Sequence, residues 1–299
     1  MRIVTRADFD GVVCAVILYE ALDITVPVKW VEPNEIQKGL VDIKEGDILA
    51  NLPYSENCEL WFDHHYSNRV EMPFRGAFKI APSAAGIVYE YYIDKMRRNF
   101  YELVKETDRI DSADLTMDEV LHPEKYPYLL ISMTISGRDK SDEKYWNKLV
   151  ELLRKHEIAD VIEDPEVKKR CNKVIKENRA YKELLIKSTS ITEQVAVTDF
   201  RSYDTAPVGN RFLVYSLFPE TVVQVKIRFG DDKDKIVLSA GHSIFNRNCN
   251  VNVGLLLSEF GGGGHEGAGG CSFSSDKASE YIPRIIETFK ENRMENNKK

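Results

Sequence analysis

The stretch WFDHHYSN (residues 61–68) decides how this 299-residue chain is interpreted. Residues 59–62 (ELWF), which include the aromatic start of this stretch, are typical of a short buried strand. One carboxylate and two imidazoles follow directly, at Asp63, His64 and His65. Buried charged groups need partners, because an unpaired buried charge is costly. This strand end is therefore the first candidate for a functional site.

The sequence around this stretch predicts an α/β fold with a parallel sheet. Apolar, β-branched segments alternate with helical ones, which is typical of βαβ units. The predicted strands are RIVT (2–5), VPVKWV (26–31), DILANL (47–52) and ELWFD (59–63), and the predicted helices cover 11–22 and 82–96. In such open sheets, ligands bind beyond the carboxyl ends of the strands.

The second half of the chain predicts another domain. A charged, helical region extends from about 143 to 187, and strands are expected again at 194–200, 222–229 and 235–241, before a last amphipathic helix from about 276. We therefore predict an N-terminal parallel-sheet domain (1–160), a helical connector (161–188) and a smaller α/β domain (189–299).

Composition and charge restrict the class of partner. Lys and Arg total 41 against 48 Asp and Glu, a net charge of −7, which argues against a broad electrostatic grip on long nucleic acid. Five scattered cysteines favour reduced thiols and a cytoplasmic location. The apolar segment 11–22 is too short to cross a bilayer, and we expect neither a signal peptide nor membrane association.

Polar side chains follow several of the predicted strands. Asp8 and Asp10 come after the first strand, Asn51 ends the third, and an acidic run, TDRIDSAD (107–114), lies further along. Carboxylates and imidazoles that converge from separate strand ends indicate a site for Mn²⁺ or Mg²⁺. Each group also has a structural interpretation: DFDG (8–11) is typical of a turn, and the acidic run of a capped helix terminus.

The order of these motifs resembles the DHH phosphoesterase family. DFDG, FDHH (62–65), the acidic run and GGGGHEGAGG (261–270) occur in sequence, and the resemblance covers nearly the whole chain, with a DHH-associated C-terminal domain. The family includes nano-RNases, cyclic-dinucleotide phosphodiesterases, RecJ-like exonucleases and exopolyphosphatase-like enzymes. The resemblance implies a metal-dependent phosphoesterase that hydrolyses a short nucleotide in a cleft between two domains.

The resemblance also implies a set of metal ligands. Asp8 and Asp10 would each bind one of two ions, and His64 would bind the second ion together with Asp10. We expect Asp108, with Asp111 as the rival, to complete the set. Asp63 would orient His64 by a hydrogen bond, as outer carboxylates do for metal-bound imidazoles.

The remaining roles concern the reaction itself. His65 would contact the substrate phosphate or assist the leaving oxygen. The metal would activate a water and stabilise charge on the phosphate oxygens.

Two positions depart from the family pattern. Relatives carry His or Asp before the first aspartate, where this chain has Val4 and Arg6, and they carry a bridging aspartate where it has Asn51. These losses weaken the first ion's site, so we predict one firmly bound Mn²⁺ or Mg²⁺. Arg6 would supply positive charge in place of the first ion; the alternatives are a surface arginine or an Arg6–Asp8 ion pair.

The predicted second domain would hold the substrate. Glycines 262–264, with His265, predict a loop whose N–H groups approach an anion, and we favour this over a hairpin connection. Arg247 is the expected phosphate partner because its planar fork binds two oxygens. Phe245 and Phe260 are available for base stacking, although core positions are the better prediction for both.

Three functions remain open from the sequence. The first is hydrolysis of a linear or cyclic dinucleotide, or of a similarly short oligonucleotide. The second is an exopolyphosphatase-like hydrolysis of inorganic polyphosphate, and the third is nucleotide binding with weakened catalysis because of Asn51 and Arg6. We favour the first, with a small phosphate-containing substrate, and allow for a homodimer.

Overall fold

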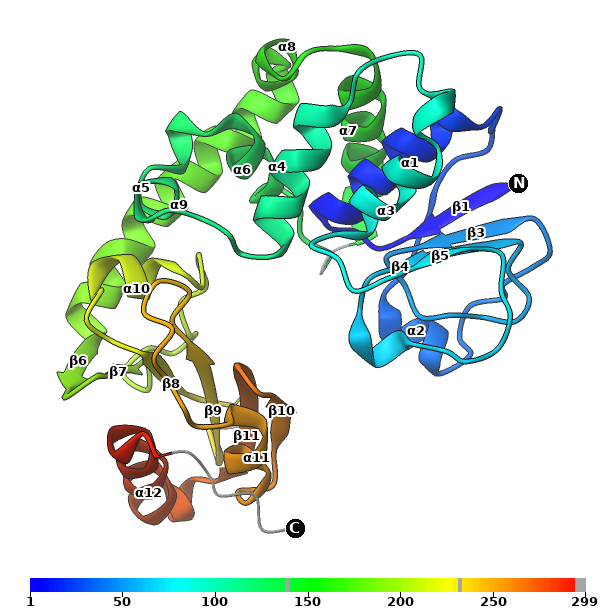
Figure 1. The fold of residues 1–299 in the computed structure, drawn as a ribbon. Coiled ribbons are helices and arrows are strands. Elements are labelled where there is room, and N and C mark those ends of the chain that lie inside the picture. The colour runs from blue at the N-terminus through cyan, green and yellow to red at the C-terminus, as the bar shows by residue number, and fades with distance from the viewer. Residues whose placement is uncertain (138–139, 231–232, 294–299) are drawn as a thin grey trace. The chain divides into compact units, whose positions relative to one another are not determined.

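The computed structural model describes residues 1–137, 140–230 and 233–293, and it divides the chain into two compact units (Figure 1). Unit 1 comprises residues 1–115 and 122–174, and unit 2 comprises residues 116–121 and the chain from 175 onward. The long helix α9 (Pro165–Ser188) contributes to both units. The predicted α/β class, with a parallel sheet followed by a smaller α/β part, is confirmed.

Unit 1 is built on a five-stranded sheet of order β2-β1-β3-β4-β5, in which all paired strands are parallel. The strands are β1 (Arg2–Thr5), β2 (Lys29–Trp30), β3 (Asp47–Ala50), β4 (Leu60–Asp63) and β5 (Gly76–Phe78). The carboxyl ends of β1, β3 and β4 therefore meet at one edge of the sheet, which is where the polar motifs begin.

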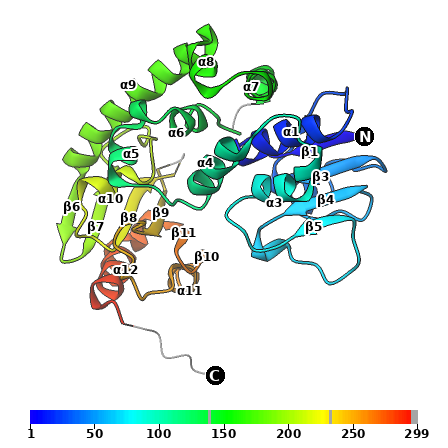
Figure 2. The same cartoon turned by 45° about the horizontal axis from the view of Figure 1, so that its top comes forward.

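Helices cover the sheet of unit 1. Helix α1 packs against α3, α4 and α7, while α2 lies across the sheet from them (Figures 1 and 2). The helices are α1 (Phe9–Ala21), α2 (Pro33–Gln37), α3 (Ala84–Tyr91), α4 (Tyr101–Asp111), α6 (Pro127–Ser132), α7 (Glu143–Lys155) and α8 (Ile158–Glu163). Asp8 caps the amino end of α1 by accepting from Gly11 N–H at 2.8 Å.

Aromatic side chains pack around Trp61 of β4. Trp61 is fully buried, stacks on Phe78 with ring centroids 5.2 Å apart, and donates from Nε1 to the Leu52 carbonyl at 2.8 Å. Buried aromatic rings contribute much of a core's stability, and the indole N–H has the partner that burial requires. These contacts fix the position of β4, the strand that ends in Asp63.

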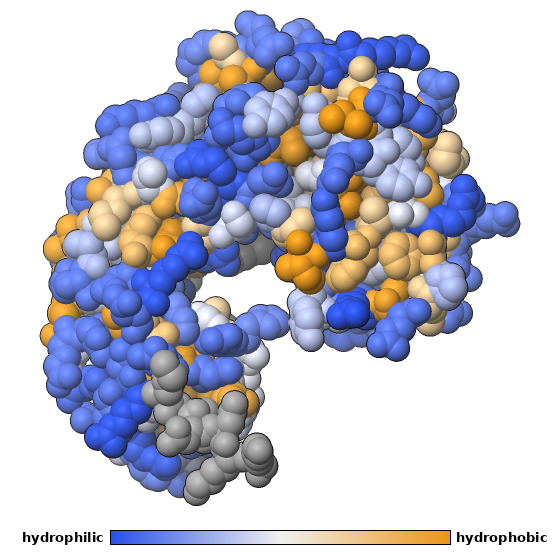
Figure 3. All heavy atoms as spheres, in the orientation of Figure 1, coloured by the Kyte–Doolittle hydropathy of each residue, from blue (hydrophilic) through white to orange (hydrophobic). Residues whose placement is uncertain are grey.

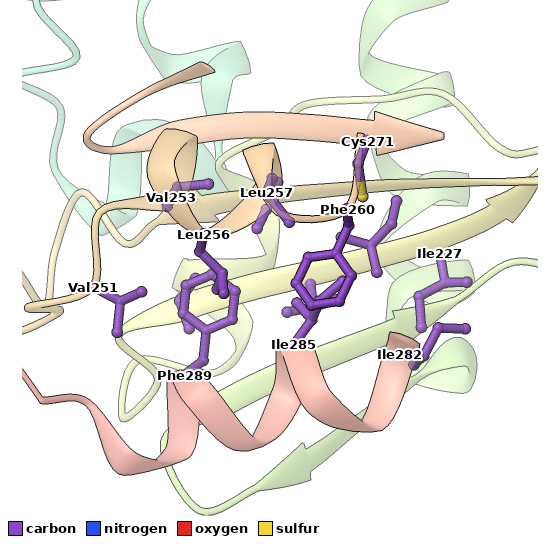
Figure 4. Close-up of a cluster of buried hydrophobic side chains, with 14 of the residues drawn as sticks. Ile227, Val251, Val253, Leu256, Leu257, Phe260, Cys271, Ile282, Ile285 and Phe289 are labelled. Atoms are coloured by element: carbon purple, nitrogen blue, oxygen red, sulfur yellow. The ribbon is translucent and has the colours of Figure 1, made fainter. Parts of the chain in front are cut away.

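Unit 2 contains a six-stranded mixed sheet of order β10-β11-β9-β8-β7-β6, in which only the β7–β8 pair is parallel among the described residues. Its strands are β6 (Thr189–Thr192), β7 (Val195–Asp199), β8 (Val223–Phe229), β9 (Lys235–His242), β10 (Gly263–His265) and β11 (Ala268–Ser274). Its shorter helices are α5 (Met117–Leu121), α10 (Leu213–Leu217), α11 (Val253–Ser258) and α12 (Ala278–Glu291). Figure 4 shows Ile285 and Phe289 of α12 packed with Leu256 of α11 in the core of this unit.

The glycine cluster forms a β-hairpin, so the prediction of an open loop in preference to a hairpin is wrong. β10 and β11 pair antiparallel, with Gly264 opposite Gly269. A Cβ atom at Gly264, where φ is +150°, would lie 2.4 Å from the Ala268 carbonyl oxygen, and one at Gly254 would lie 2.5 Å from the Gly264 carbonyl oxygen. The glycines are required because backbones of the hairpin and of α11 approach closely.

Most predicted elements lie within a few residues of the observed ones. The short strands β5 and β6 were not predicted, because three or four residues are too few to show a clear alternation. On the face shown in Figure 3, hydrophobic residues are interspersed among hydrophilic ones. None of the helices in the described part of the chain has the length and apolar character needed to cross a membrane.

Candidate active site

Asp10 is a buried acid of the site, in the first turn of α1. Its Oδ1 accepts from Ala85 N–H at 2.7 Å and its Oδ2 from Ala84 N–H at 3.0 Å, so the carboxylate lies against the amino end of α3. Burial, reinforced by the charges of Asp111 and Asp8, raises the Asp10 pKa well above its ordinary value. The carboxylate is thus fixed in position while its negative charge is poorly solvated.

His64 directs its Nε2 at this acid. Its Nδ1 lies 2.9 Å from the Ala81 carbonyl oxygen, which can only accept, so Nδ1 carries the hydrogen. In the neutral ring, Nε2 is then an acceptor, and it is buried without a hydrogen-bond partner among the described residues. It lies 3.8 Å from Asp10 Oδ2 and 3.5 Å from Asp111 Oδ2.

Asp111, rather than Asp108, joins this group. Asp111 is the last residue of α4, and burial together with the charge of Asp8 raises its pKa to about 6. Asp108 instead accepts a 2.5 Å hydrogen bond from the Ser83 hydroxyl, which caps α3. The expected ligand Asp108 is thus engaged with Ser83, whereas its rival Asp111 lies with Asp10 and His64.

The grouping of Asp10, His64 and Asp111 fits a divalent cation. One ligand atom from each lies within 4.8 Å of the others. Metal-bound histidines usually donate their second nitrogen to a carbonyl, as His64 does to Ala81. Two carboxylates and one imidazole suit Mn²⁺ or Mg²⁺.

Asn51 lies beside this group at the end of β3. Its Nδ2 donates to Asp8 Oδ1 at 3.0 Å, which leaves Oδ1 buried without a partner among the described residues. Its φ of +56° is in the left-handed region, which is uncommon for a residue other than glycine. An amide oxygen held in this way is an acceptor without charge.

Arg6 pairs with two acids at the site, so the alternative of an Arg6–Asp8 ion pair is what the structure contains. Its Nη1 lies 3.4 Å from Asp8 Oδ2, and its Nε lies 3.4 Å from Glu32 Oε2. Asp8 therefore has a guanidinium at one oxygen, and the helix cap and the Asn51 amide at the other. Its carboxylate is compensated without a metal ion.

Asp63 orients His65 and not His64, which corrects the predicted hydrogen bond. Asp63 is fully buried, and its Oδ1 lies 2.8 Å from His65 Nδ1. This hydrogen bond is the main cause that raises the His65 pKa. The side chain of His65 remains 41% exposed, so its other nitrogen is available to a ligand.

The sequence analysis gave no role to Tyr66, Asn68 or Glu32. Asn68 Nδ2 donates to Asp63 Oδ2 at 2.7 Å, and Tyr66, next to His65, is 76% exposed. Tyr66 and Asn68 lie inside the opening WFDHHYSN stretch, where an exposed aromatic and an amide directly after two histidines are the signal. Glu32 carried no comparable signal, since its pairing with Arg6 depends on β1 and β2 being neighbours.

The predicted substrate-binding residues of unit 2 differ in exposure and in how their polar groups are engaged. Arg247 is exposed, and only its Nε is engaged, by the Ile244 carbonyl. His265 is exposed at the end of β10. The N–H of Gly262 donates to the Leu257 carbonyl at 3.0 Å and is unavailable to an anion. Phe260 is a core residue, as expected.

Comparisons with known proteins find similarity among solved structures only. Neither a scan against protein-family models nor a search of curated proteins finds a match. Among solved structures, the chain is similar to PggH, a pGpG-specific phosphodiesterase from Vibrio cholerae, with 31% identity and a TM-score of 0.87 over 98% of this chain and 99% of that one.

Two more distant structures share the fold. An exopolyphosphatase-related protein from Bacteroides fragilis is 13% identical, with a TM-score of 0.55 over 97% of this chain and 92% of that chain. RecJ from Thermus thermophilus, in complex with Mn²⁺, is 12% identical, with a TM-score of 0.56 over 97% of this chain and 52% of that chain.

The fold and the site together define a metal-dependent phosphoesterase, a hydrolase with its acids and imidazoles at the carboxyl edge of a parallel sheet. The chain belongs to the DHH phosphoesterase family, and the predicted resemblance is confirmed.

Proposed function

We propose that this protein hydrolyses the phosphodiester bond of short linear dinucleotides of the pGpG type. The observation that carries this proposal is the 31% identity to a pGpG-specific phosphodiesterase over 98% of this chain and 99% of the other. Addition of water across the bond, with the 3′ oxygen as leaving group, would give two molecules of GMP.

One divalent cation, Mn²⁺ or Mg²⁺, would be held by Asp10, His64 and Asp111. When bound, such an ion supplies an activated water and charge stabilisation for the phosphate oxygens. Asp10 is presented by two backbone N–H groups of α3 and His64 by the Ala81 carbonyl, so both are oriented before a cation arrives. This preorganisation is what a precise ligand set needs.

Arg6 would take the place of a second ion. Asp8 is already compensated by Arg6, by Asn51 and by the helix cap, and Asn51 brings no charge. The Arg6 side chain is 41% exposed, which leaves its guanidinium open to a substrate phosphate. Calorimetric titration with Mn²⁺ should give one tight site per chain, and two tight sites would contradict this assignment.

His65 would deliver a proton to the leaving oxygen. Asp63 binds Nδ1, so the partly exposed Nε2 is the nitrogen that faces a substrate. A positioned imidazole is the commonest general acid, and Asp63 would stabilise its charged form.

A nucleotide fits the surroundings of the site better than polyphosphate does. Tyr66 is 76% exposed and follows His65 directly, so a base attached to a phosphate at His65 would have an aromatic ring within reach. Base–aromatic stacking contributes about 1–3 kcal/mol per base. Inorganic polyphosphate would make no use of such a ring.

The C-terminal part, 189–299, is proposed as the substrate-binding domain, and 1–160 as the catalytic one. Arg247 and His265 would bind phosphate, and Gly263 and Gly264 would line the same hairpin. A cytoplasmic location and a homodimer are further proposals; the five cysteines are free, as reduced thiols would be.

The test is to incubate the protein with pGpG and excess Mn²⁺ and to follow GMP by chromatography. Asp10→Asn sets the background, and a polyphosphate of similar charge is the competing substrate. GMP formation that the variant lacks would support the proposal. Phosphate release from polyphosphate alone would replace it with the exopolyphosphatase function, and tight pGpG binding without turnover would favour a binding protein.

A further inference from the structure

A closed set of three hydrogen bonds follows strand β4. His65 Nδ1 lies 2.8 Å from Asp63 Oδ1, Asn68 Nδ2 donates to Asp63 Oδ2 at 2.7 Å, and the Asn68 backbone N–H donates to the His65 carbonyl at 2.9 Å. The last bond forms the short 3₁₀ turn η1 (Tyr66–Asn68). Asn68 thus contacts both the acid and the backbone of the histidine that the acid holds.

The burial of Asp63 explains why Asn68 matters. The Asp63 side chain has no solvent exposure, so its two oxygens depend on protein donors. Among the described residues, one donor serves each oxygen, His65 at Oδ1 and Asn68 at Oδ2. A carboxylate that loses one of these donors is free to rotate or to take up a proton, and either change weakens its hold on the imidazole.

We infer that Asn68 is a positioning residue for His65, acting through Asp63. The amide fixes the plane of the Asp63 carboxylate, the carboxylate keeps a hydrogen on His65 Nδ1, and the ring then presents Nε2 outward. This inference rests on the proposed function, in which the doubly protonated His65 ring gives its Nε2 proton to the leaving 3′ oxygen as the P–O bond breaks, and retains the Nδ1 hydrogen that is bonded to Asp63.

A purely structural role for Asn68 is the competing explanation, since the same bonds would also hold the turn. The two explanations differ in what they predict for the reaction. A positioning role affects only the step in which a poor leaving group must be protonated, whereas a structural role affects every substrate and the metal site.

The experiment compares Asn68→Ala with Ser67→Ala, a control in the same turn whose exposed side chain makes no hydrogen bond within the described part of the chain. With pGpG, Asn68→Ala should lower kcat by about 10- to 100-fold with KM changed less than about threefold. With a nitrophenyl ester of a nucleotide, whose leaving group needs no proton, the loss should be less than about threefold. Mn²⁺ stoichiometry should be unchanged.

Equal losses on both substrates, or an altered Mn²⁺ titration, would overturn the inference and indicate a structural role. Asn68→Asp is the second variant: it keeps the size of the side chain but places a carboxyl group beside Asp63, and it should show the same substrate-dependent loss.

A measurement without substrate separates this inference from the proposed function. Nitrogen-15 NMR, recorded at a pH where the His65 ring is neutral, should show hydrogen on Nδ1 in the parent chain and a mixed tautomer in Asn68→Ala. An unchanged tautomer would overturn the inference even if pGpG is hydrolysed. If the tautomer changes in Asn68→Ala as expected but the parent chain does not cleave pGpG, the proposed function alone would be contradicted.

Discussion

The strand ends of unit 1 and the glycine hairpin of unit 2 differ in how their polar groups are satisfied. In unit 1, His64 Nε2 and Asn51 Oδ1 are buried without partners among the described residues, beside an acid whose pKa is strongly raised. In unit 2, the N–H of Gly262 is bonded and the hairpin backbones are closely packed. Close packing thus explains the glycines of the hairpin, whereas the unsatisfied buried atoms of unit 1 are ones that a ligand could satisfy.

The largest loss of activity is expected from a substitution at the candidate metal site of unit 1. Asp10→Asn should lower turnover of pGpG by about 10³-fold or more, because it removes the fixed charge of the ligand set and turns an amide toward the N–H groups of α3. Activity and Mn²⁺ binding would be measured on the same sample. Retention of both would mean that the cation is bound elsewhere.

The second prediction distinguishes two aspartates on one helix. Asp111→Asn should weaken Mn²⁺ binding by about 10- to 100-fold, whereas Asp108→Asn should change it less than about threefold. The reason is that Asp108 accepts from Ser83, a bond that an amide oxygen can replace. Calorimetry on the two variants is the measurement. The reverse order of effects would restore Asp108 as the ligand.

The third prediction concerns pH. Because burial and Asp8 raise the Asp111 pKa to about 6, this group holds a proton below that pH in the metal-free protein. A cation must displace the proton, so Mn²⁺ affinity should fall as the pH decreases through 6, by about tenfold per pH unit for each proton released. In Asp111→Asn, the slope of the logarithm of Mn²⁺ affinity against pH should be smaller by one proton. An identical slope in both proteins would assign the proton to another group.

The fourth prediction tests the hairpin of unit 2. Gly264→Ala should lower the free energy of unfolding by about 1–3 kcal/mol, because its Cβ would meet the Ala268 carbonyl. Gly263→Ala is the matched control, since no atom lies within 4 Å of its added Cβ. Denaturant unfolding would measure both. Equal destabilisation would mean that backbone freedom, and not close packing, explains the glycines.

The smallest effect concerns the exposed ring beside the site. Tyr66→Ala should raise KM for pGpG about fivefold, and Tyr66→Phe should leave it nearly unchanged, because stacking needs the ring and not the hydroxyl. Steady-state kinetics with both variants would decide. A loss in the Phe variant as well would point to a hydrogen bond from the hydroxyl.

Sequence patterns were sufficient where a residue's role depends on its neighbours in the chain. Asp10 and His64 follow strands whose apolar character is evident, so their meeting at one sheet edge follows from the parallel arrangement. The choice between Asp108 and Asp111 could not be made from the sequence, because it depends on how α4 is placed against α3. That placement depends on side chains distant in sequence, including Ser83.

The sequence by itself determined the family, the α/β class and the strand ends at which charged residues converge, because these depend on local periodicity and on an ordered set of motifs. Only the tertiary structure decided which nitrogen of His64 is free, that Asp63 serves His65, and that the glycines form a hairpin. Those features depend on hydrogen bonds and close contacts between separate elements, whose distances and directions arise only once the chain has packed.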